Sequence, residues 1–399
     1  MASAEAPFPL ARRGGTYVRQ PTGYRAFIPK PLPPDPPLNM DAELLNRLSA
    51  ADQALGRLDG TATLLPDPDW FVYTYVRKEA VLSSQIEGTQ ASLVDVLEYE
   101  AGTPHHRLPA GTAEVVNYVA AMNHGLERLR ELPLSLRLMR EIHERLLEGV
   151  RGSEWTPGEF RRSQNWVGPP GGLLADATYV PPPVHEMTQA LGDLERFLHQ
   201  EVPMPALVKC ALVHSQFETI HPFLDGNGRM GRLLITFLLC QQGILAKPLL
   251  YLSYYFKRRR ADYYERLQAV RDEGDWEGWV RFFLQGVAEV SAQATDTAKR
   301  ILTMRERHRN LVQARMRTAN ALRLLEFLFS RPLISINEAA GLLKLTYGAA
   351  NRLVAQMGQL GLVREVTGGA RFRLFAYQPY LAILSEGAEP EPSAPPRTG

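Results

Sequence analysis

Apolar residues recur every three or four positions along most of the chain after Asp41. The first such stripe consists of leucines: Leu44, Leu45, Leu48, Leu55 and Leu58. This spacing places apolar side chains on one face of an α-helix, and Gly60 marks its expected end. The same spacing predicts helices at 70–82, 92–99, 112–131, 134–149, 183–200, 204–221, 228–242, 260–272 and 275–290. The pattern therefore predicts a mainly α protein.

Residues 163–183 depart from helical spacing. Two short β-type stretches, 163–168 and 177–180, flank the turn-rich sequence Pro169-Pro-Gly-Gly172. Glycine and proline in the middle of such a segment favour a tight turn. We therefore expect a small β-hairpin inserted between helices.

The pattern changes again near the C-terminus, at 318–380. Three helices are expected there, and the second begins with the capping box Ser335-Ile-Asn-Glu338. Strands at 362–366 and 371–375 follow, joined through Gly368-Gly369. Three helices followed by a hairpin form a winged helix-turn-helix, and an Arg-rich helix at 291–317 is expected to connect it to the preceding domain.

The two ends of the chain have a different composition. Nine prolines lie within residues 1–39. Proline fixes φ and lacks a donor, so residues 1–40 are expected to form an extended arm. Residues 381–399 are rich in Pro, Glu, Gly and Ser, which predicts a disordered tail.

Composition narrows the class of protein. A chain of 399 residues exceeds the roughly 250–300 residues that one core usually serves, so two or three packed units are expected. A net charge of +2 gives no whole-chain indication of a nucleic-acid binder. None of the seven lysines follows a glycine, which excludes a P-loop of the G-x-x-x-x-G-K type.

Localisation is expected to be cytoplasmic. Cys210 and Cys240 both lie in apolar helical patterns, which fits two reduced thiols better than a disulfide framework. The first residues lack the layout of a signal peptide. The longest apolar stretch, from Leu233, is interrupted by Gln241-Gln-Gly243, so no membrane span is expected.

The sequence from His221 to Arg232 carries the chemistry. It reads His221-Pro-Phe-Leu-Asp-Gly-Asn-Gly-Arg-Met-Gly-Arg232 and contains the spacing G-x-G-x-x-G. A dinucleotide fingerprint needs a preceding strand and an acidic residue about 20 positions later. Here a helical pattern precedes the glycines, and no Asp or Glu occurs between Asp225 and Asp262. We therefore reject the dinucleotide interpretation.

The same segment predicts a phosphate site between two helices. One helix ends near His221, and the next begins near Gly228, where its first turn offers N–H groups to an anion. Arg229 and Arg232, three positions apart, can reach further phosphate oxygens. Asp225 is a suitable Mg²⁺ ligand, and His221 a suitable general base. A glycine-rich turn between two helices would explain the glycines alone, but not this combination.

The segment resembles the motif of the Fic family, His-Pro-Phe-x-Asp/Glu-Gly-Asn-Gly/Lys-Arg-x-x-Arg, at every defined position. The resemblance implies that His221 deprotonates a target hydroxyl and that Asp225 holds Mg²⁺. The remaining motif positions would bind the nucleotide, the loop residues cradling the transferred phosphoryl group and the arginines holding the outer phosphates: Gly226, Asn227, Gly228, Arg229, Met230, Gly231 and Arg232.

An inhibitory motif of the same family, Ser/Thr-x-x-x-Glu-Gly/Asn, is matched by Ser83-Ser-Gln-Ile-Glu87-Gly88. In the family this glutamate pairs with the second motif arginine, here Arg232, and disturbs the seating of the γ-phosphate. The alternative is a short helix whose exposed carboxylate precedes a glycine cap. We expect Glu87 to be inhibitory.

The hairpin at 163–183 corresponds in chain order to the flap of the family, which aligns the target backbone by strand addition. Its expected docking residues come from both stretches: Asn165, Trp166, Val167, Thr178, Tyr179 and Val180. An ordinary surface loop is the alternative. Relatives place the adenine pocket near Tyr263 and Tyr264, and the resemblance makes Tyr264 our candidate for contact with the nucleotide.

The resemblance implies two regions between the arm and the connector helix. Residues 41–110 would form the N-terminal region with the inhibitory helix, and 111–290 the catalytic core. In the winged helix, the third helix and the wing carry side chains that could contact DNA: Tyr347, Asn351, Arg352, Gln356, Arg371 and Arg373. The same module could instead serve dimerisation or partner docking.

The resemblance implies a protein adenylyltransferase that moves AMP from Mg-ATP to a Tyr, Thr or Ser hydroxyl, with ATP as substrate and Mg²⁺ as cofactor. Auto-modification and a homodimer are compatible with it. Three alternatives stay open: another nucleotide donor, removal of AMP with the help of Glu87, and a DNA-binding regulator whose Fic domain senses nucleotide.

Overall fold

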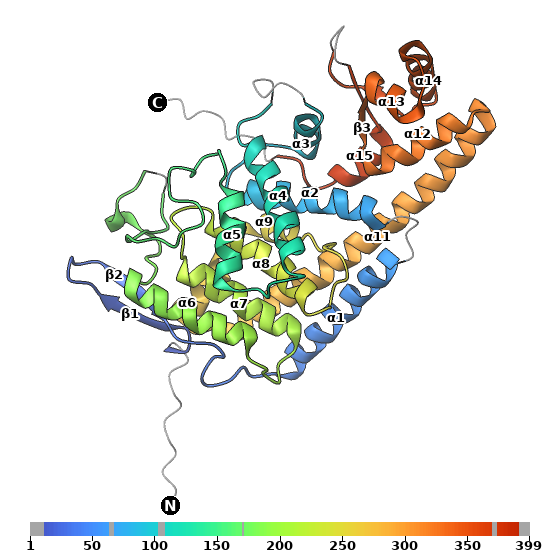
Figure 1. Ribbon diagram of the computed structural model, residues 1–399. Coiled ribbons are helices and arrows are strands. Elements are labelled where there is room, and N and C mark those ends of the chain that lie inside the picture. The colour runs from blue at the N-terminus through green and yellow to red at the C-terminus, as the bar shows by residue number, and fades with distance from the viewer. Residues whose placement is uncertain (1–11, 64–67, 103–107, 170, 369–372, 391–399) are drawn as a thin grey trace, which may run out of the picture. The chain divides into compact units, whose positions relative to one another are not determined.

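The computed structural model describes residues 12–63, 68–102, 108–169, 171–368 and 373–390 (Figure 1). Residues 1–11 of the expected arm, Arg371 of the wing and residues 391–399 of the tail lie outside the described residues. The chain forms two compact units. The first contains residues up to Gly56 together with Asn117–Ala246 and Tyr255–Ser291, and the second contains the remainder.

The first unit contains a β-hairpin and a set of packed helices (Figure 1). The strands are β1 (Gly15–Arg19) and β2 (Arg25–Pro29). The helices wholly within this unit are α5 (Leu136–Leu146), α6 (Val184–His199), α7 (Ala206–Ile220), α8 (Asn227–Gln241) and α10 (Arg260–Asp272). Four helices contribute residues to both units: α1 (Ala42–Thr63), α4 (Thr112–Arg128), α9 (Ser253–Arg258) and α11 (Trp276–Met316).

Helix α7 is the centre of the first unit. Every residue from Leu207 to Ile220 is buried. It packs against α6, α8, α10 and strand β2. Helix α8 is buried along most of its length as well, including the polar residues of its first turn. A helix without an exposed face belongs in a core, so the α7–α8 junction is held rigidly between packed elements.

The second unit contains α2, α3 and the winged helix. Its elements are α2 (Pro68–Ile86), α3 (Leu93–Glu100), α12 (Ala319–Ser330), β3 (Leu333–Ser335), α13 (Ile336–Leu343), α14 (Tyr347–Gln359), β4 (Arg364–Glu365), β5 (Leu374–Ala376) and α15 (Gln378–Ser385). The strands form an antiparallel sheet in the order β3-β5-β4. The mainly α fold and the winged helix are confirmed.

The capping box that opens α13 has the expected form. Ser335 Oγ accepts from the Glu338 backbone N at 3.2 Å, and Glu338 Oε2 accepts from the Ser335 backbone N at 2.8 Å. These two bonds satisfy backbone donors that a helix start leaves unpaired. The winged helix also has a strand, β3, that the apolar pattern did not predict.

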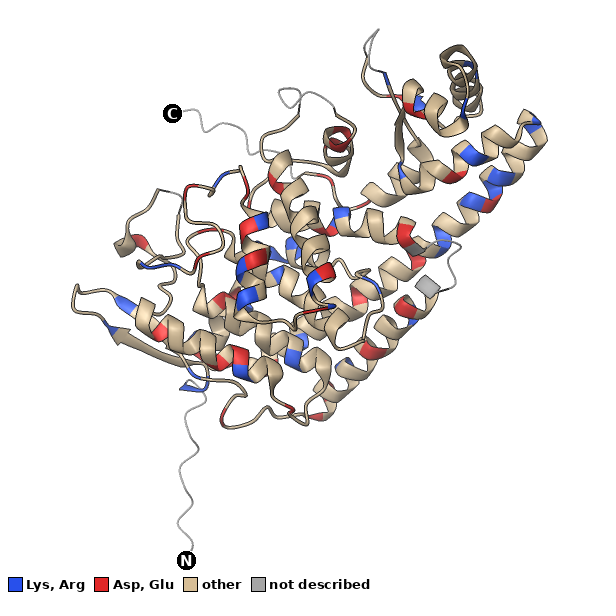
Figure 2. Ribbon diagram, viewed as in Figure 1, with Lys and Arg blue, Asp and Glu red and all other residues tan. Residues whose placement is uncertain are grey.

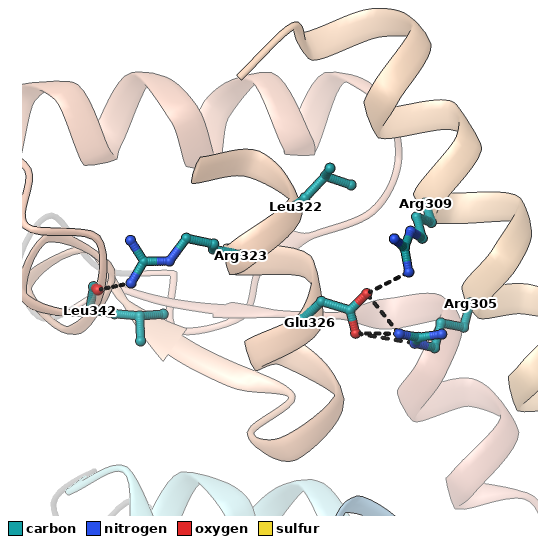
Figure 3. A pocket seen from close by; sticks show the side chains of 6 residues that line it. All are labelled: Arg305, Arg309, Leu322, Arg323, Glu326 and Leu342. Atoms are coloured by element: carbon teal, nitrogen blue, oxygen red, sulfur yellow. Dashed lines mark hydrogen bonds and ion pairs between the residues drawn. The ribbon is translucent and has the colours of Figure 1, made fainter. Parts of the chain in front are cut away.

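Arg-rich α11 is joined to α12 by ion pairs. Figure 3 shows Glu326 of α12 facing Arg305 and Arg309 of α11 across a pocket of about 410 Å³. Glu326 Oε2 lies 2.9 Å from Arg305 Nη2, and Glu326 Oε1 lies 4.0 Å from Arg309 Nη1. Figure 2 shows basic and acidic residues mixed along this part of α11, so its arginines do not form a purely basic face.

Three expectations are corrected by the structure. The extended arm instead contains the β1–β2 hairpin, because the alternating Thr16–Arg19 and Ala26–Ile28 segments pair across a turn that holds Gly23 at φ 100°. The connector expected at 291–317 is the second half of α11, which continues from Trp276 without a break. Residues 381–385 of the expected tail belong to α15, which buries Tyr380, Leu381 and Leu384.

Residues 386–388 continue past α15 and bind to α2; we call them the C-terminal strap. Lys78 Nζ of α2 donates to the Glu386 carbonyl at 2.9 Å, and Gln85 Nε2 donates to the Ala388 carbonyl at 3.0 Å. The Glu386 carboxylate forms a two-pronged ion pair with Arg300 of α11. Burial lowers the pKa of Lys78 to about 8.

No helix in the described residues has both the length and the apolar character needed to cross a membrane.

Candidate active site

The junction between α7 and α8 brings the motif residues together. Helix α7 ends at Ile220, and His221 follows in the left-handed conformation with φ 50° and ψ 60°. Gly226 precedes α8 with φ 77°. Non-glycine residues rarely adopt a positive φ, so His221 is held in an uncommon conformation that turns the chain sharply at the expected base.

The loop between these two residues is closed by its own side chains. Asn227 binds both backbone groups of Phe223: its Oδ1 accepts from the nitrogen at 2.9 Å and its Nδ2 donates to the oxygen at 2.8 Å. Asp225 Oδ1 accepts from the Gly226 nitrogen at 2.7 Å. Asn227 therefore shapes the loop through its side chain, while its backbone N–H lies in the first turn of α8.

The first turn of α8 is an anion-binding arrangement. The first helical bond runs from the Met230 nitrogen to the Gly226 oxygen at 2.9 Å. The N–H groups of Asn227 and Gly228 therefore precede that bond, at the positive end of the helix dipole. Arg229 and Arg232 are only 1% and 2% exposed, so their charges lie in a low-dielectric environment beside this turn.

Asp225, the predicted metal ligand, lies in the loop just before α8. Its side chain is 35% exposed, and its Oδ2 lies 3.8 Å from Arg229 Nη2. Gly152, at φ 89°, approaches the same carboxylate so closely that a Cβ there would lie 2.6 Å from Asp225 Oδ2. The described residues contain no group of three or more His, Cys, Asp or Glu arranged to hold a metal. One carboxylate beside an anion-binding turn fits Mg²⁺, which binds through few carboxylates together with substrate phosphates.

Met230 and Gly231 are packed into the protein. Met230 is fully buried. A Cβ on Gly231 would overlap Oε1 of Glu218 on α7, and the Gly231 carbonyl accepts from Nδ1 of His214 at 2.9 Å. The third glycine of the motif therefore allows close α7–α8 packing, and the nucleotide role expected for these two residues stays a prediction.

His143 of α5 supports the loop and was not found from the sequence. Its Nδ1 accepts from the Gly158 nitrogen at 3.0 Å, so its Nε2 carries the proton and donates to the Asp225 carbonyl at 2.9 Å. Its ring stacks on Phe223 with centroids 3.7 Å apart. Burial lowers the pKa of His143 to about 4, which keeps the ring neutral and the tautomer fixed.

The expected hairpin at 163–183 is reduced to one antiparallel bridge, Val167 with Tyr179. A short 3₁₀ turn, η3 (Leu174–Asp176), lies between the two stretches. The glycines and prolines leave too little regular backbone for longer strands. The antiparallel bridge still joins the two stretches, and we call residues 163–183 the flap.

The flap residues divide into two groups. Trp166 and Val167 are each 39% exposed, and Thr178 is not buried either. The other three predicted docking residues are buried: Asn165, Tyr179 and Val180. Asn165 Nδ2 donates to the Phe223 carbonyl at 2.7 Å, and the Tyr179 hydroxyl donates to the Thr219 carbonyl at 2.5 Å. Only the first group presents side chains to solvent, and the docking role predicted for these residues stays a prediction.

The β1–β2 hairpin packs against the base of the flap. The Phe27 nitrogen donates to the Val180 carbonyl at 2.9 Å, and the Phe27 and Tyr179 rings lie 6.4 Å apart. The Tyr17 hydroxyl donates to Asp272 Oδ1 of α10 at 2.7 Å. The segment expected to be an extended arm thus contributes to the support of the candidate site.

The tyrosine pair of α10 is separated by burial. Tyr263 is 1% exposed, and its hydroxyl donates to Nε2 of His214 at 2.9 Å. Tyr264 is 42% exposed. Tyr263 is therefore a core residue, and Tyr264 stays the candidate for stacking on a nucleobase.

The expected inhibitory residues lie at the end of α2, in the second compact unit. Ser83 is fully buried within the helix. Glu87 follows the last residue of α2 in a turn in which its nitrogen donates to the Ser84 carbonyl at 3.1 Å, and Gly88 has φ 96°. The positive φ explains the glycine at this position. The pairing of Glu87 with Arg232 stays a prediction.

Models of known protein families match three segments of the chain. Residues 45–127 match the Fic/DOC family N-terminal region, residues 133–239 match the Fic/DOC family, and residues 322–376 match an HTH DNA binding domain. A protein from Aquifex aeolicus named "Probable protein adenylyltransferase" is 27% identical over 187 residues, which are 47% of this chain and 54% of that protein. "Protein adenylyltransferase Fic" from Aedes aegypti is 38% identical over 152 residues, 37% of this chain and 27% of that protein.

The chain thus spans about half the length of the Aquifex relative and a smaller share of the mosquito protein. A crystal structure of a Fic family protein from Desulfovibrio desulfuricans G20 has the same fold, with a TM-score of 0.54 at 18% identity over 86% of this chain and 97% of that one. The matched segments show that residues 45–127 and 133–239 of this chain are Fic/DOC family regions, and the complete motif of that family lies at the α7–α8 junction.

Proposed function

We propose that this protein is an adenylyltransferase that transfers AMP from ATP to a hydroxyl side chain of a protein. The α7–α8 junction carries the proposal. In it, His221 begins the loop that leads into α8, buried Arg229 lies in the first turn of that helix, and buried Arg232 lies in the next turn. The names of the Fic relatives support AMP as the transferred group.

In the proposed reaction the target oxygen attacks the α-phosphorus of ATP, and the bond from that phosphorus to the β-phosphate oxygen breaks. His221 takes the proton of the attacking hydroxyl, and pyrophosphate leaves with the electron pair. The N–H groups of the first turn of α8 stabilise the charge on the transferred group. Arg229 and Arg232 bind the outer phosphates.

Asp225 would hold Mg²⁺ in this site. The ion would neutralise negative charge on the nucleotide phosphates. The Gly226 N–H donates to the Asp225 carboxylate, and His143 donates to the Asp225 backbone carbonyl. Asp225 is therefore fixed from two sides before any nucleotide arrives.

Intact-mass analysis of the protein after incubation with Mg²⁺ and each nucleoside triphosphate tests the proposal. We expect an adduct of one AMP with ATP, absent in EDTA and absent in Asp225→Ala. If an adduct forms only with another nucleoside triphosphate, that nucleotide is the donor and ATP is not. If wild type and Glu87→Gly form no adduct with any donor, on themselves or on proteins of a cell extract, the proposed activity is wrong.

We also propose that Glu87 inhibits the enzyme by pairing with Arg232. The match of Ser83–Gly88 to the family motif and the glycine-dependent turn after α2 support this role. Removal of AMP by the same site, with Glu87 orienting a water molecule, is the alternative. Incubation of the labelled protein without ATP separates the two, because only AMP removal releases the label.

DNA binding by the winged helix is a second candidate function, supported by the match to an HTH DNA binding domain. Tyr347 on α14 is 53% exposed, and Arg352 and Gln356 are exposed on the same helix. Arg373 Nη2 donates to Asn351 Oδ1 at 3.0 Å, so these two candidate DNA-contact residues lie next to each other. An electrophoretic shift of the full chain should weaken with salt, and Arg352→Ala should reduce the salt slope by about one. A full chain that shifts no DNA at low salt contradicts this candidate.

A further inference from the structure

Arg161 lies beneath the α7–α8 junction and binds three backbone carbonyls from different segments. Its Nε donates to the His221 carbonyl at 3.0 Å, and its Nη1 donates to the Ser163 carbonyl at 3.1 Å. Its Nη2 donates to the Pro182 carbonyl. Ser163 and Pro182 lie near the two ends of the flap, so one guanidinium connects both legs of the flap to the backbone of the expected base.

The environment of Arg161 explains why an arginine is needed there. The residue is 1% exposed, and burial lowers its pKa to about 10, so it stays charged at neutral pH. The planar guanidinium presents several N–H donors in a fixed fork, whereas an ammonium is a point charge on a flexible stem. Each of the three carbonyls accepts a hydrogen bond from a different nitrogen of this guanidinium.

Further contacts join the same two elements. The Arg161 nitrogen donates to the Pro222 carbonyl at 2.9 Å. Asn165 Nδ2, in the first leg, lies 3.4 Å from the His221 carbonyl as well as 2.7 Å from that of Phe223. The hydroxyl of Tyr179, in the second leg, binds the carbonyl of Thr219 at the end of α7. Each leg of the flap is thus bonded to the chain that carries His221.

We propose that Arg161 is a positioning residue that couples the flap to the general base. One of its bonds holds the carbonyl of His221, whose backbone is in the left-handed conformation, and the other two hold the two flap legs to the same guanidinium. A target segment that docks on the flap is thereby set in register with the imidazole. This inference rests on the proposed function, because His221 is the base only if the transfer reaction occurs.

The chain offers a matched control in the neighbouring residue. The Arg162 side chain is 85% exposed and forms only a surface ion pair with Glu159 among the contacts described. Arg161→Lys and Arg162→Lys therefore make the same chemical change at adjacent positions, one beneath the junction and one in solvent. Lysine keeps the charge and most of the volume, but its donors all lie on one nitrogen and cannot reproduce the separate positions of Nε, Nη1 and Nη2.

Transfer kinetics of both variants, made in the Glu87→Gly background so that activity is measurable, provide the first test. We expect Arg161→Lys to lower kcat per ATP-binding site by about tenfold to about a hundredfold, since small misplacements of reacting groups have effects of this size. ATP affinity and binding stoichiometry should stay within about threefold, while Arg162→Lys changes neither. A loss of activity that merely follows a loss of ATP-binding sites would indicate a structural role and overturn the proposal.

Hydrogen exchange of the protein without nucleotide provides a second test that needs no activity. The Val167 and Thr178 amides report on the flap, and the Phe223 amide reports on the loop. Arg161→Lys should accelerate exchange in both places, and Arg162→Lys in neither. If the flap amides alone accelerate, or none do, Arg161 does not couple the two elements. An enzyme that forms no adduct would refute the proposed function but leave this test valid.

Tyr179→Phe covers the case in which Arg161→Lys does not fold. It removes one hydroxyl, the donor to the Thr219 carbonyl, and keeps the ring. We expect a severalfold decrease in kcat per ATP-binding site, with faster exchange at Phe223. An unchanged kcat together with unchanged exchange would overturn the coupling.

Discussion

The α7–α8 junction and the winged helix are built from different kinds of interaction. Around the junction, polar side chains are buried and bind backbone atoms of other segments, as Arg161, His143 and Asn165 do. Between residues 318 and 380, every buried side chain among the described residues is apolar or belongs to a tyrosine or proline. The polar capping residue Ser335 lies at a helix end instead.

The difference has a consequence for tolerance to substitution. An apolar core accepts changes of similar volume, because its contacts are not directional. A buried polar network depends on the direction of each bond, and loss of one partner leaves the other without compensation. The junction should therefore respond sharply to small chemical changes that the winged helix tolerates.

The largest effect is expected at the base. His221→Ala should lower AMP transfer by about 10²–10⁴-fold while ATP still binds, because general base catalysis typically contributes that much. Radiolabelled ATP and a binding titration measure the two properties. Tyr347→Ala on α14, which is exposed, is the control and should leave transfer unchanged. Full activity of His221→Ala would remove this residue from the mechanism.

Alanine substitutions at two helical glycines compare the α7–α8 junction with the winged helix directly. In α8, Gly231→Ala would press a methyl group against Glu218 and Phe217, which should destabilise the protein by about 1–3 kcal/mol. In α13, a methyl group on Gly341 would meet no neighbouring side chain within 4 Å, so Gly341→Ala should stabilise by about 0.5–1 kcal/mol. Urea unfolding measures both. Equal effects at the two sites would contradict the contrast.

A pH dependence is expected from His214 of α7, whose Nδ1 donates to the Gly231 carbonyl of α8. Burial lowers its pKa from 6.5 to about 3, so the unfolded chain takes up a proton below pH 6.5 that the folded protein refuses. The stability present above pH 6.5 is therefore lost as the pH falls, by about 2 kcal/mol at pH 5. The unfolding free energy of His214→Gln should fall less between pH 7 and pH 5. Parallel curves for the two proteins would refute the assignment.

The last prediction concerns regulation. Glu87→Gly should raise auto-AMPylation by at least about tenfold, which corresponds to about 1.4 kcal/mol of relieved competition for Arg232. Adding Arg232→Ala should cancel the gain, because the arginine that Glu87→Gly makes available for the γ-phosphate is then missing. Autoradiography of the purified protein measures both. A gain that persists in the double variant would indicate general loosening of α2 instead.

The sequence predicted the helices and the junction because both leave local signals. Apolar spacing located α7, α8 and α10 to within a few residues, and the motif located His221–Arg232 in one uninterrupted segment. Arg161 and His143 left no such signal, since their partners are backbone carbonyls up to 82 positions away. Prolines masked the β1–β2 hairpin, whose strands gain stability by pairing and by packing on Tyr179.

The C-terminal strap supplies hydrogen-bond acceptors to two side chains of α2. A protein cut after Ser385 would keep every helix and strand of the winged helix, yet Lys78 and Gln85 would lose the carbonyls of Glu386 and Ala388. A buried ammonium without its acceptor is unfavourable, so α2 would have to shift or admit water. Removal of the strap is therefore a change to the helix that leads into Glu87, some 300 residues earlier in the sequence.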